Sequence, residues 1–257
     1  MSTTLVRHAT VEESILSLEI DNPPVNAISR QVRQELRNIF NTIDESIKVI
    51  ILKGSNRIFC CGDDIKEAKN NLDTSISKVQ ETLIEFGALM SLIAEVPIPT
   101  IALIDGWCIG GGLELALCAD LRIASSSAKF RGAGVNIGLM ASTYRLSQLI
   151  GIARAKELLL TAATIDAEQA LSYGMVTSVV PSDELTEAGL SLARTIAAKA
   201  PLSIQATKKS IDNSGRLSKS DNDDYNRESL LRLSETNDYK RAIEAHLNKE
   251  APKFEGN

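Results

Sequence analysis

Histidine is nearly absent from this chain of 257 residues, which contains only His8 and His246, near its opposite ends. A serine–histidine–aspartate triad and a histidine-ligated metal site both need an imidazole close to the other functional groups. Neither histidine lies near a recognisable motif. The sequence therefore predicts neither triad chemistry nor a metal site.

Cysteine is also scarce, with four residues at positions 60, 61, 108 and 118. Cys60 and Cys61 are adjacent, and the other spacings do not match the paired pattern of a structural zinc site. We expect four free thiols, buried or partly buried, in a protein of a reducing compartment.

The chain also lacks a basic surplus and long apolar runs. Its formal charge is −5, and Lys208-Lys209 is too short to form a basic patch for nucleic acid. No apolar run reaches the length of a membrane span, and the N-terminus lacks the basic and then apolar pattern of a secretory signal. These absences predict a cytoplasmic protein with neither a nucleic-acid nor a membrane partner.

Hydrophobic residues make up 44% of the chain, enough for a sizeable core. Their periodicity predicts strands at 15–20, 48–53, 100–104, 121–124 and 175–180, and helices after Ser29, near residue 64, and at 76–95 and 113–119. From residue 182 the pattern is helical, over 183–199, 202–213 and 222–248, with a polar loop at 215–224. The alternation of strands and helices indicates an α/β protein with a largely parallel sheet.

Three consecutive glycines, Gly110, Gly111 and Gly112, lie between an expected strand and an expected helix. Such a turn brings backbone amides close to a ligand, because no side chains intervene and the first amides of a helix have no internal partners. Tight packing of a helix on a sheet is the structural alternative. The glycine spacing does not fit the G-x-G-x-x-G pattern of dinucleotide-binding proteins. Glu114, one turn into an otherwise apolar helix, needs a partner or a task if it is buried.

Four segments occur in this order: 22–28 (NPPVNAI), 59–67 (FCCGDDIKE), 106–114 (GWCIGGGLE) and 171–181 (LSYGMVTSVVP). With them the chain resembles the crotonase, or enoyl-CoA hydratase/isomerase, superfamily over nearly its whole length. The resemblance implies an α/β fold in which repeated ββα units wind as a crotonase-like spiral, here over residues 1–195. It also implies a C-terminal helical trimerisation region over 196–257, and thus a homotrimer or a dimer of trimers.

The resemblance also implies an acyl-CoA thioester as the substrate, with no cofactor besides the coenzyme A that the substrate carries. Gly111 and Asp63 match the two residues whose backbone amides form the oxyanion hole. Glu114 matches a catalytic glutamate that acts as general acid and base. The substrate-binding positions are Val25, Arg57, Cys61, Asp64, Ile65, Lys66, Gly110, Gly134, Ser142, Lys253 and Phe254. Among these, Arg57 and Lys66 match basic positions near the CoA phosphates, and Lys253 and Phe254 match a tail that closes the CoA site.

Two positions depart from the family pattern. Many relatives carry a neutral residue where this chain has Asp63; its side chain either faces a loop or solvent and helps to cap the next helix, or contacts a particular acyl group. Gly134 stands where hydratases carry a second glutamate, and the nearby Asn136 cannot exchange a proton at neutral pH.

The segment 139–146 is about three residues shorter than the hydratase pattern. Its Tyr144 and Arg145 either enter the pocket or start the next helix, with the tyrosine packed and the arginine solvated. We expect an enzyme of the enoyl-CoA hydratase/isomerase type, a lyase or isomerase. The alternatives are a decarboxylase or double-bond isomerase that uses one acid, and a non-catalytic CoA-binding homologue. With one acid instead of two, we expect weak hydration of crotonyl-CoA.

Overall fold

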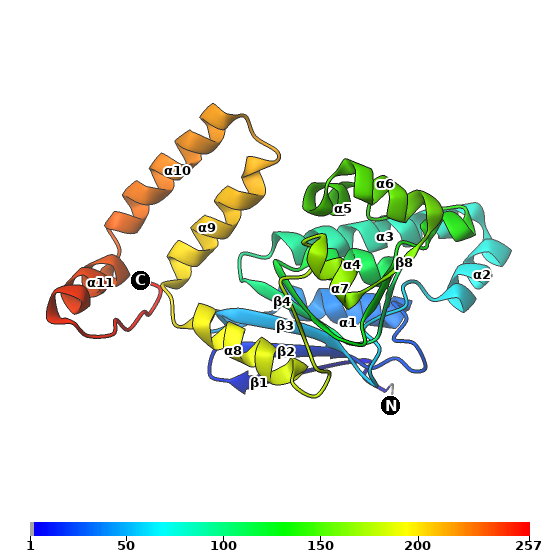
Figure 1. Ribbon diagram of the computed structural model, residues 1–257, viewed down its shortest axis with the longest axis horizontal. Coiled ribbons are helices and arrows are strands. Elements are labelled where there is room, and N and C mark those ends of the chain that lie inside the picture. Colours follow the sequence, from blue (N-terminus) through cyan, green and yellow to red (C-terminus); the bar gives the residue numbers. More distant parts are fainter. Residues whose placement is uncertain (1–2) are drawn as a thin grey trace.

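The computed structural model describes residues 3–257 and contains two sheets covered by helices (Figure 1). The strands are β1 (Val6–Glu12), β2 (Ile15–Ile20), β3 (Val49–Gly54), β4 (Thr100–Ile104), β5 (Trp107–Ile109), β6 (Leu121–Ser125), β7 (Lys129–Arg131), β8 (Thr164–Asp166) and β9 (Ser178–Val180). The helices are α1 (Arg30–Asn41), α2 (Ile65–Thr74), α3 (Ile76–Glu95), α4 (Gly111–Cys118), the 3-10 turn η1 (Gly134–Ile137), α5 (Thr143–Ile150), α6 (Ile152–Thr161), α7 (Ala167–Ser172), α8 (Leu185–Ala197), α9 (Pro201–Ser214), α10 (Lys219–Ser234) and α11 (Asn237–Asn248).

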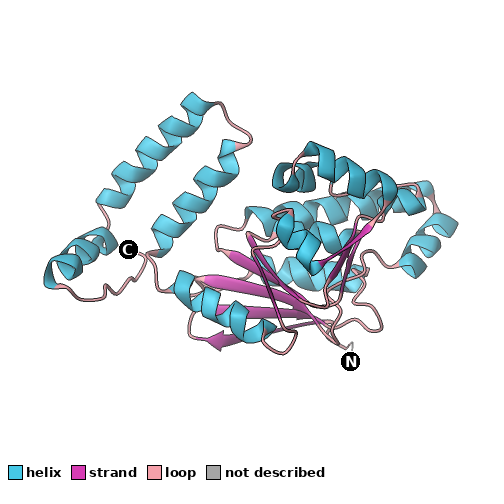
Figure 2. Cartoon of the chain, viewed as in Figure 1, coloured by secondary structure: helices cyan, strands magenta, loops and turns pink. Residues whose placement is uncertain are grey.

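The larger sheet has six strands in the order β1-β2-β3-β4-β6-β9, and all neighbours are parallel except β1 and β2. The smaller sheet has the order β5-β7-β8, with a parallel and an antiparallel pair. Figure 2 shows helices on both sides of the larger sheet. The expected α/β class with a largely parallel sheet is confirmed.

The central strand β3 is buried on both faces, as its continuous apolar run predicts. Val49 and Ile51 belong to a core cluster that includes side chains of α8, whereas Ile50 and Leu52 belong to the larger cluster on the opposite face. Alternate residues of a strand point to opposite faces, so one short run contributes to both clusters. The sheet is therefore packed on both faces and supports the loops that follow its strands.

Local signals set the helix ends where the sequence places them. The Ser29 hydroxyl accepts a hydrogen bond from the Val32 amide at 3.4 Å and so caps α1. Helix α3 covers the predicted range 76–95 and ends two residues before Pro97.

The expectation for the C-terminal region is wrong in two details. The predicted helix 222–248 is two helices, because α10 ends at Ser234 and the Thr236 hydroxyl accepts from the Tyr239 amide to cap α11. The predicted loop 215–224 ends early, because Ser218 caps α10, which begins at Lys219. In both places a capping side chain decides the helix boundary, and the overall polarity of the segment does not.

Helices α9, α10 and α11 form an arm that extends from the layered core (Figure 1). The tail after α11 folds back to the arm, where the Asp238 carboxylate accepts hydrogen bonds from the amides of Glu255 and Gly256, both at 2.9 Å. The predicted domain division between residues 195 and 196 falls in the last turn of α8 and stays a prediction. Among residues 3–257, no helix is both long and apolar enough to cross a membrane.

Candidate active site

Two loops that are far apart in sequence are joined by backbone hydrogen bonds. The Cys60 amide donates to the Trp107 carbonyl at 3.1 Å, and the Ile109 amide donates to the Cys60 carbonyl at 2.9 Å. The loops after β3 and β4 therefore run side by side, and Gly62 and Gly111 become neighbours.

Glycine is required where these backbones meet. A Cβ atom on Gly112 would lie 2.1 Å from the Cys60 carbonyl oxygen, and one on Gly62 would lie 2.8 Å from the Gly111 nitrogen. Gly110 has φ +55° and ψ −117°, a conformation that side chains oppose, and the space beside its Cα is open. Both interpretations of the glycine-rich turn are therefore correct for different residues. Gly62 and Gly112 allow close backbone packing, and Gly110 leaves space open to a ligand.

The Gly111 amide is unpaired in the described part of the chain, whereas the Asp63 amide contacts only the carboxyl group of its own residue. Over residues 3–257, neither amide donates to a backbone carbonyl, and Gly111 is the first residue of α4, where helix geometry leaves the amide unpaired. Since a Cβ atom on Gly62 would lie only 2.8 Å from the Gly111 nitrogen, the Gly62 backbone is near Gly111, and the next amide along the chain, that of Asp63, is close by. Two such donors can hold an oxygen atom that gains negative charge.

Glu114 lies one turn into α4, on the same face as Gly111, with only 9% of its surface exposed. Arg145 of α5 donates from Nη1 to Glu114 Oε1 at 2.5 Å. The second oxygen, Oε2, is buried without a hydrogen-bond partner among the described residues. A buried carboxylate with one oxygen held and one free is suited to accepting a proton.

The suggestion that Asp63 caps the following helix is wrong. Asp64 caps α2, because its Oδ1 accepts from the amides of Lys66 at 2.9 Å and Glu67 at 3.1 Å. Asp63 instead faces inward, and its Oδ2 lies 3.1 Å from the place where a Cβ of Gly111 would stand, beside the Phe86 ring.

Burial is the main cause that raises the pKa of the Asp63 carboxyl. The Arg33 guanidinium lowers this pKa, the Glu67 carboxylate raises it, and the hydrogen bond from the Asp63 amide lowers it, each by less than burial does. A carboxyl group with raised proton affinity therefore lies at the edge of the proposed oxyanion hole.

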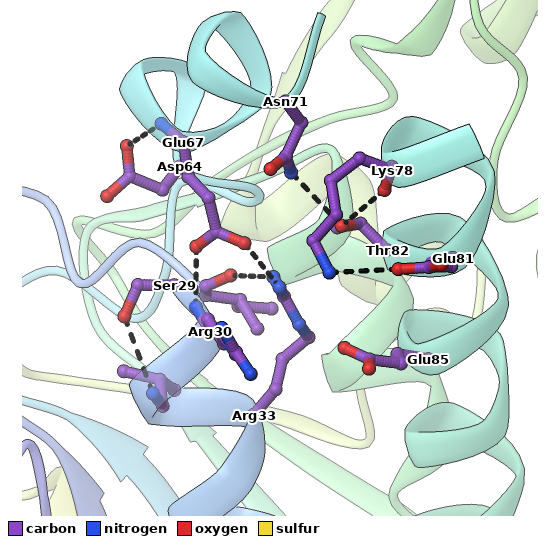
Figure 3. Close-up of polar contacts among 12 residues, drawn as sticks. Ser29, Arg30, Arg33, Asp64, Glu67, Asn71, Lys78, Glu81, Thr82 and Glu85 are labelled. Atoms are coloured by element: carbon purple, nitrogen blue, oxygen red, sulfur yellow. Dashed lines mark hydrogen bonds and ion pairs between the residues drawn. The ribbon is translucent and has the colours of Figure 1, made fainter. Parts of the chain in front are cut away.

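A buried arginine under these loops was not expected from the sequence. Arg33 is 3% exposed; its Nη1 donates to the Ile28 carbonyl at 3.0 Å, and its Nη2 pairs with Glu67 (Figure 3). Glu67 also accepts from the Arg30 amide at 2.6 Å, which ties α1 to α2. The only sequence signal was a charged residue beside Val32 on the apolar stripe of α1.

Most of the predicted substrate-binding positions lie on the segments that these contacts hold. The Cys61 amide donates to the Val25 carbonyl at 3.1 Å, so the early loop is beside the 59–67 segment. Ile65 and Lys66, in the first turn of α2, are exposed. Arg57, two residues before the 59–67 segment, is exposed, and its carbonyl lies against Gly106.

All four cysteines are free, and Cys61 is the one that is not fully buried. Burial raises the pKa of the Cys60 thiol to about 12. Over the described residues, no three His, Cys, Asp or Glu side chains gather in a group that could hold a metal ion.

The structure fills the space beside Gly134. A Cβ on this residue would lie 2.9 Å from the Leu139 carbonyl oxygen and 3.3 Å from the Ala141 nitrogen. The short 138–142 segment thus lies against Gly134, the position that the family resemblance aligns with the second glutamate of hydratases. Ser142, at the end of this segment, has φ +60° and a buried hydroxyl without a partner in the described part of the chain.

Tyr144 and Arg145 both start a helix, as one alternative predicted, but with the opposite exposures. Tyr144 is 50% exposed, whereas the Arg145 side chain is turned inward onto Glu114. The reason is electrostatic, because a buried carboxylate in an apolar helix attracts the nearest cation.

The C-terminal positions Lys253 and Phe254 are not brought to this site by their own chain. The Phe254 carbonyl accepts from Lys48 Nζ at 3.0 Å, and Lys48 directly precedes β3. The glycine-rich loops follow the opposite, carboxyl end of β3 and β4. The tail therefore lies at the amino end of β3, opposite to the end from which the glycine-rich loops emerge.

Comparison with known proteins agrees with this geometry. The family model described as enoyl-CoA hydratase/isomerase matches residues 10–257. A Bacillus subtilis (strain 168) protein named "Probable enoyl-CoA hydratase" is 34% identical, over 96% of this chain and 97% of its own. An enoyl-CoA isomerase/hydratase of Mycosarcoma maydis is 32% identical, over 94% of this chain and 93% of its own.

Solved structures are similar over the full length. A crystal structure of enoyl-CoA hydratase from Bacillus anthracis aligns with a TM-score of 0.94 at 28% sequence identity. The alignment covers 98% of this chain and 100% of that one. The layered core and the C-terminal arm are thus shared with a known fold.

Proposed function

Because this chain belongs to the enoyl-CoA hydratase/isomerase family, we propose that it converts acyl-CoA thioesters through an enolate-like intermediate. The observation that carries the proposal is the position of buried Glu114, one helical turn from the unpaired Gly111 amide. One group can move a proton while the other holds the negative charge that results.

The thioester oxygen would lie between the amides of Gly111 and Asp63. As a proton leaves the carbon next to the thioester, or one further along the acyl chain, the electron pair moves toward that oxygen. Two fixed amides stabilise this charge without having to reorganise, and removal of one such donor costs about two to three orders of magnitude in rate.

Glu114 would take the proton on Oε2, the oxygen that has no partner among the described residues, while Arg145 holds Oε1. In a double-bond shift, the same carboxyl then returns the proton to a different carbon, so no proton is gained or lost overall. The chemistry needs one carboxyl group and the two amides, all of which this chain supplies.

The lack of a second acid favours double-bond isomerisation or decarboxylation over efficient hydration. Hydration needs a water molecule that is held and deprotonated while a proton reaches the neighbouring carbon. Gly134 provides no carboxyl group, and the backbone of Leu139 and Ala141 fills the space beside it. We therefore propose weak hydration of crotonyl-CoA. A non-catalytic CoA-binding protein is the competing proposal.

Glu114→Gln tests the proposal directly. Glutamine keeps the size of the side chain but cannot exchange a proton at neutral pH. We expect turnover of enoyl-CoA substrates, followed by absorbance and by mass, to fall by about two to four orders of magnitude. Binding of CoA, measured by thermal shift, should remain.

Glu157→Gln, on the exposed surface of α6, is the matched control and should keep full turnover. An active Glu114→Gln variant would assign the proton transfer to Asp63 or another group. A native protein that binds CoA but converts no enoyl-CoA would support the non-catalytic alternative. Absence of any thermal shift at millimolar CoA would contradict the whole proposal.

We further propose that the enzyme is cytoplasmic and works as a homotrimer or a dimer of trimers. The position of the tail supports an assembly, since Lys253 and Phe254 lie away from the site of their own chain. In an assembly, they could reach the CoA site of a neighbouring subunit.

A further inference from the structure

Arg145 has hydrogen-bonding capacity that Glu114 does not use. Its Nη1 donates to Glu114, whereas Nε and Nη2 have no partner among the described residues and are not fully buried. The side chain is 25% exposed. A guanidinium presents its donors as a planar fork, so the free ones can still hold a second anion.

These free donors lie at the wall of a large cavity. The cavity has a volume of about 1160 Å³ and is lined by Arg145, by Leu117 and Cys118 of α4, and by residues of α9 and α10. Cys118 follows Glu114 by one turn on the same face of α4. Glu114 itself does not line the cavity, so Arg145, which contacts Glu114 and also lines the cavity, is the link between the two.

The charges of the cavity wall favour an anionic group. Lys208 pairs with Asp120 and Arg216 with Glu95, so these charges are balanced within the wall. Arg145 is balanced by Glu114. The remaining charged lining residues are Arg122, Lys209 and Arg232 against Asp212, an excess of positive charge. Arg122 already donates to backbone carbonyls, and Lys209 and Arg232 are exposed. The free Arg145 donors are therefore the ones that an apolar acyl tail would leave without a partner.

We infer that the acyl group of the preferred substrate carries a carboxylate at the end remote from CoA, and that Arg145 binds this carboxylate. This inference rests on the proposed acyl-CoA function and specifies the substrate class. Two N–H groups of one guanidinium match the two oxygens of a carboxylate. The Ser142 hydroxyl, just before the same helix, is buried and has no partner among residues 3–257.

The contact between Arg145 and Glu114 also sets the length of the acyl group. Because Glu114 acts on carbons close to the thioester, a carboxylate that reaches Arg145 can be only a few carbons further along. A five-carbon dicarboxylic acyl group fits this requirement. The competing explanation is that Arg145 only neutralises Glu114 and takes no part in substrate choice.

Binding of two unreactive thioesters separates these explanations. Glutaryl-CoA and pentanoyl-CoA have the same number of acyl carbons, and only the first ends in a carboxylate. By calorimetry, we expect the native protein to bind glutaryl-CoA at least about tenfold more tightly, the lower end for a hydrogen bond to a charged group. Arg145→Met should abolish this preference and change pentanoyl-CoA affinity by less than about threefold.

Two further variants test whether the preference depends on Arg145 in particular. Lys156→Met removes a cation from the exposed face of α6 and should keep the preference. Glu114→Gln removes the negative charge that pairs with Arg145 and should increase the preference for glutaryl-CoA over pentanoyl-CoA. If Arg145→Met does not fold because Glu114 is left buried and unpaired, the double variant Glu114→Gln/Arg145→Met removes both charges and should show no preference.

Equal binding of the two thioesters by the native protein would overturn the inference and leave the proposed function intact. An equal loss of both affinities in Arg145→Met would show that Arg145 only supports Glu114. Failure to bind CoA or either thioester would contradict the proposed function itself.

Discussion

Asp63 and Asp64 are adjacent, yet their surroundings give them different roles. Asp63 is turned toward Gly111, and burial raises its pKa, so the folded protein favours its protonated form. The stabilisation from this group is fully present below about pH 4, the ordinary value for aspartate, and is lost as pH rises through the folded-state pKa. Asp63→Asn removes this dependence. We expect its melting temperature, relative to the native protein, to increase between pH 4 and pH 7.

Asp64→Ala is the matched comparison. The Asp64 carboxylate accepts two amide hydrogen bonds at the start of α2, and loss of such a cap costs about 0.5–2 kcal/mol. Chemical denaturation at pH 7 should show this decrease in the free energy of unfolding. A decrease of the same size in Asp63→Asn, at both pH values, would contradict the inward position of Asp63.

At the scale of elements, the close contact between α4 and the 59–67 loop depends on Gly112. A methyl group there would lie 2.1 Å from the Cys60 carbonyl oxygen, so Gly112→Ala must separate the two backbones. We expect a loss of about 3 kcal/mol or more in the free energy of unfolding, at the upper end of overpacking effects, together with loss of turnover.

Gly87→Ala, in the exposed face of α3, is the control for this change. Apart from its chain neighbours and the backbone of its own helix turn, no atom of residues 3–257 lies within 4 Å of the added methyl group, and the residue is helical. Here alanine should stabilise the protein by about 0.5–1 kcal/mol, because glycine loses more backbone freedom on folding. Similar effects of the two substitutions in urea denaturation would show that α4 and the loop are not tightly joined.

At the scale of the whole molecule, the arm exposes apolar side chains that a single chain leaves uncovered. Leu230 and Leu231 of α10 are 68% and 62% exposed, and Ile211 and Leu247 are also exposed. Large exposed apolar surfaces mark sites of association. These side chains are consistent with association. For the proposed homotrimer or dimer of trimers, light scattering should give three or six times the 27.8 kDa mass of one chain.

Leu230→Asp should lower that mass toward one chain, because a carboxylate in an apolar interface is costly. Leu160→Asp, at a similarly exposed position on α6, should leave the mass unchanged. A native protein of 27.8 kDa at micromolar concentration would contradict the proposed assembly.

The sequence by itself determined the features that depend on neighbours along the chain. The apolar run of β3, the Ser29 cap and the glycines before Glu114 could be recognised because periodicity, capping and backbone freedom are local properties. The family motifs then indicated which backbone amides and which carboxyl group to consider.

Only the tertiary structure decided where the charged side chains point. Glu114 and Arg145 are 31 residues apart, and their contact depends on how α5 packs against α4. The inward turn of Asp63 and the backbone that covers Gly134 likewise result from segments brought together by folding. A charged side chain can lie in several directions at similar local cost. Its direction is therefore fixed by burial and by partners remote in sequence.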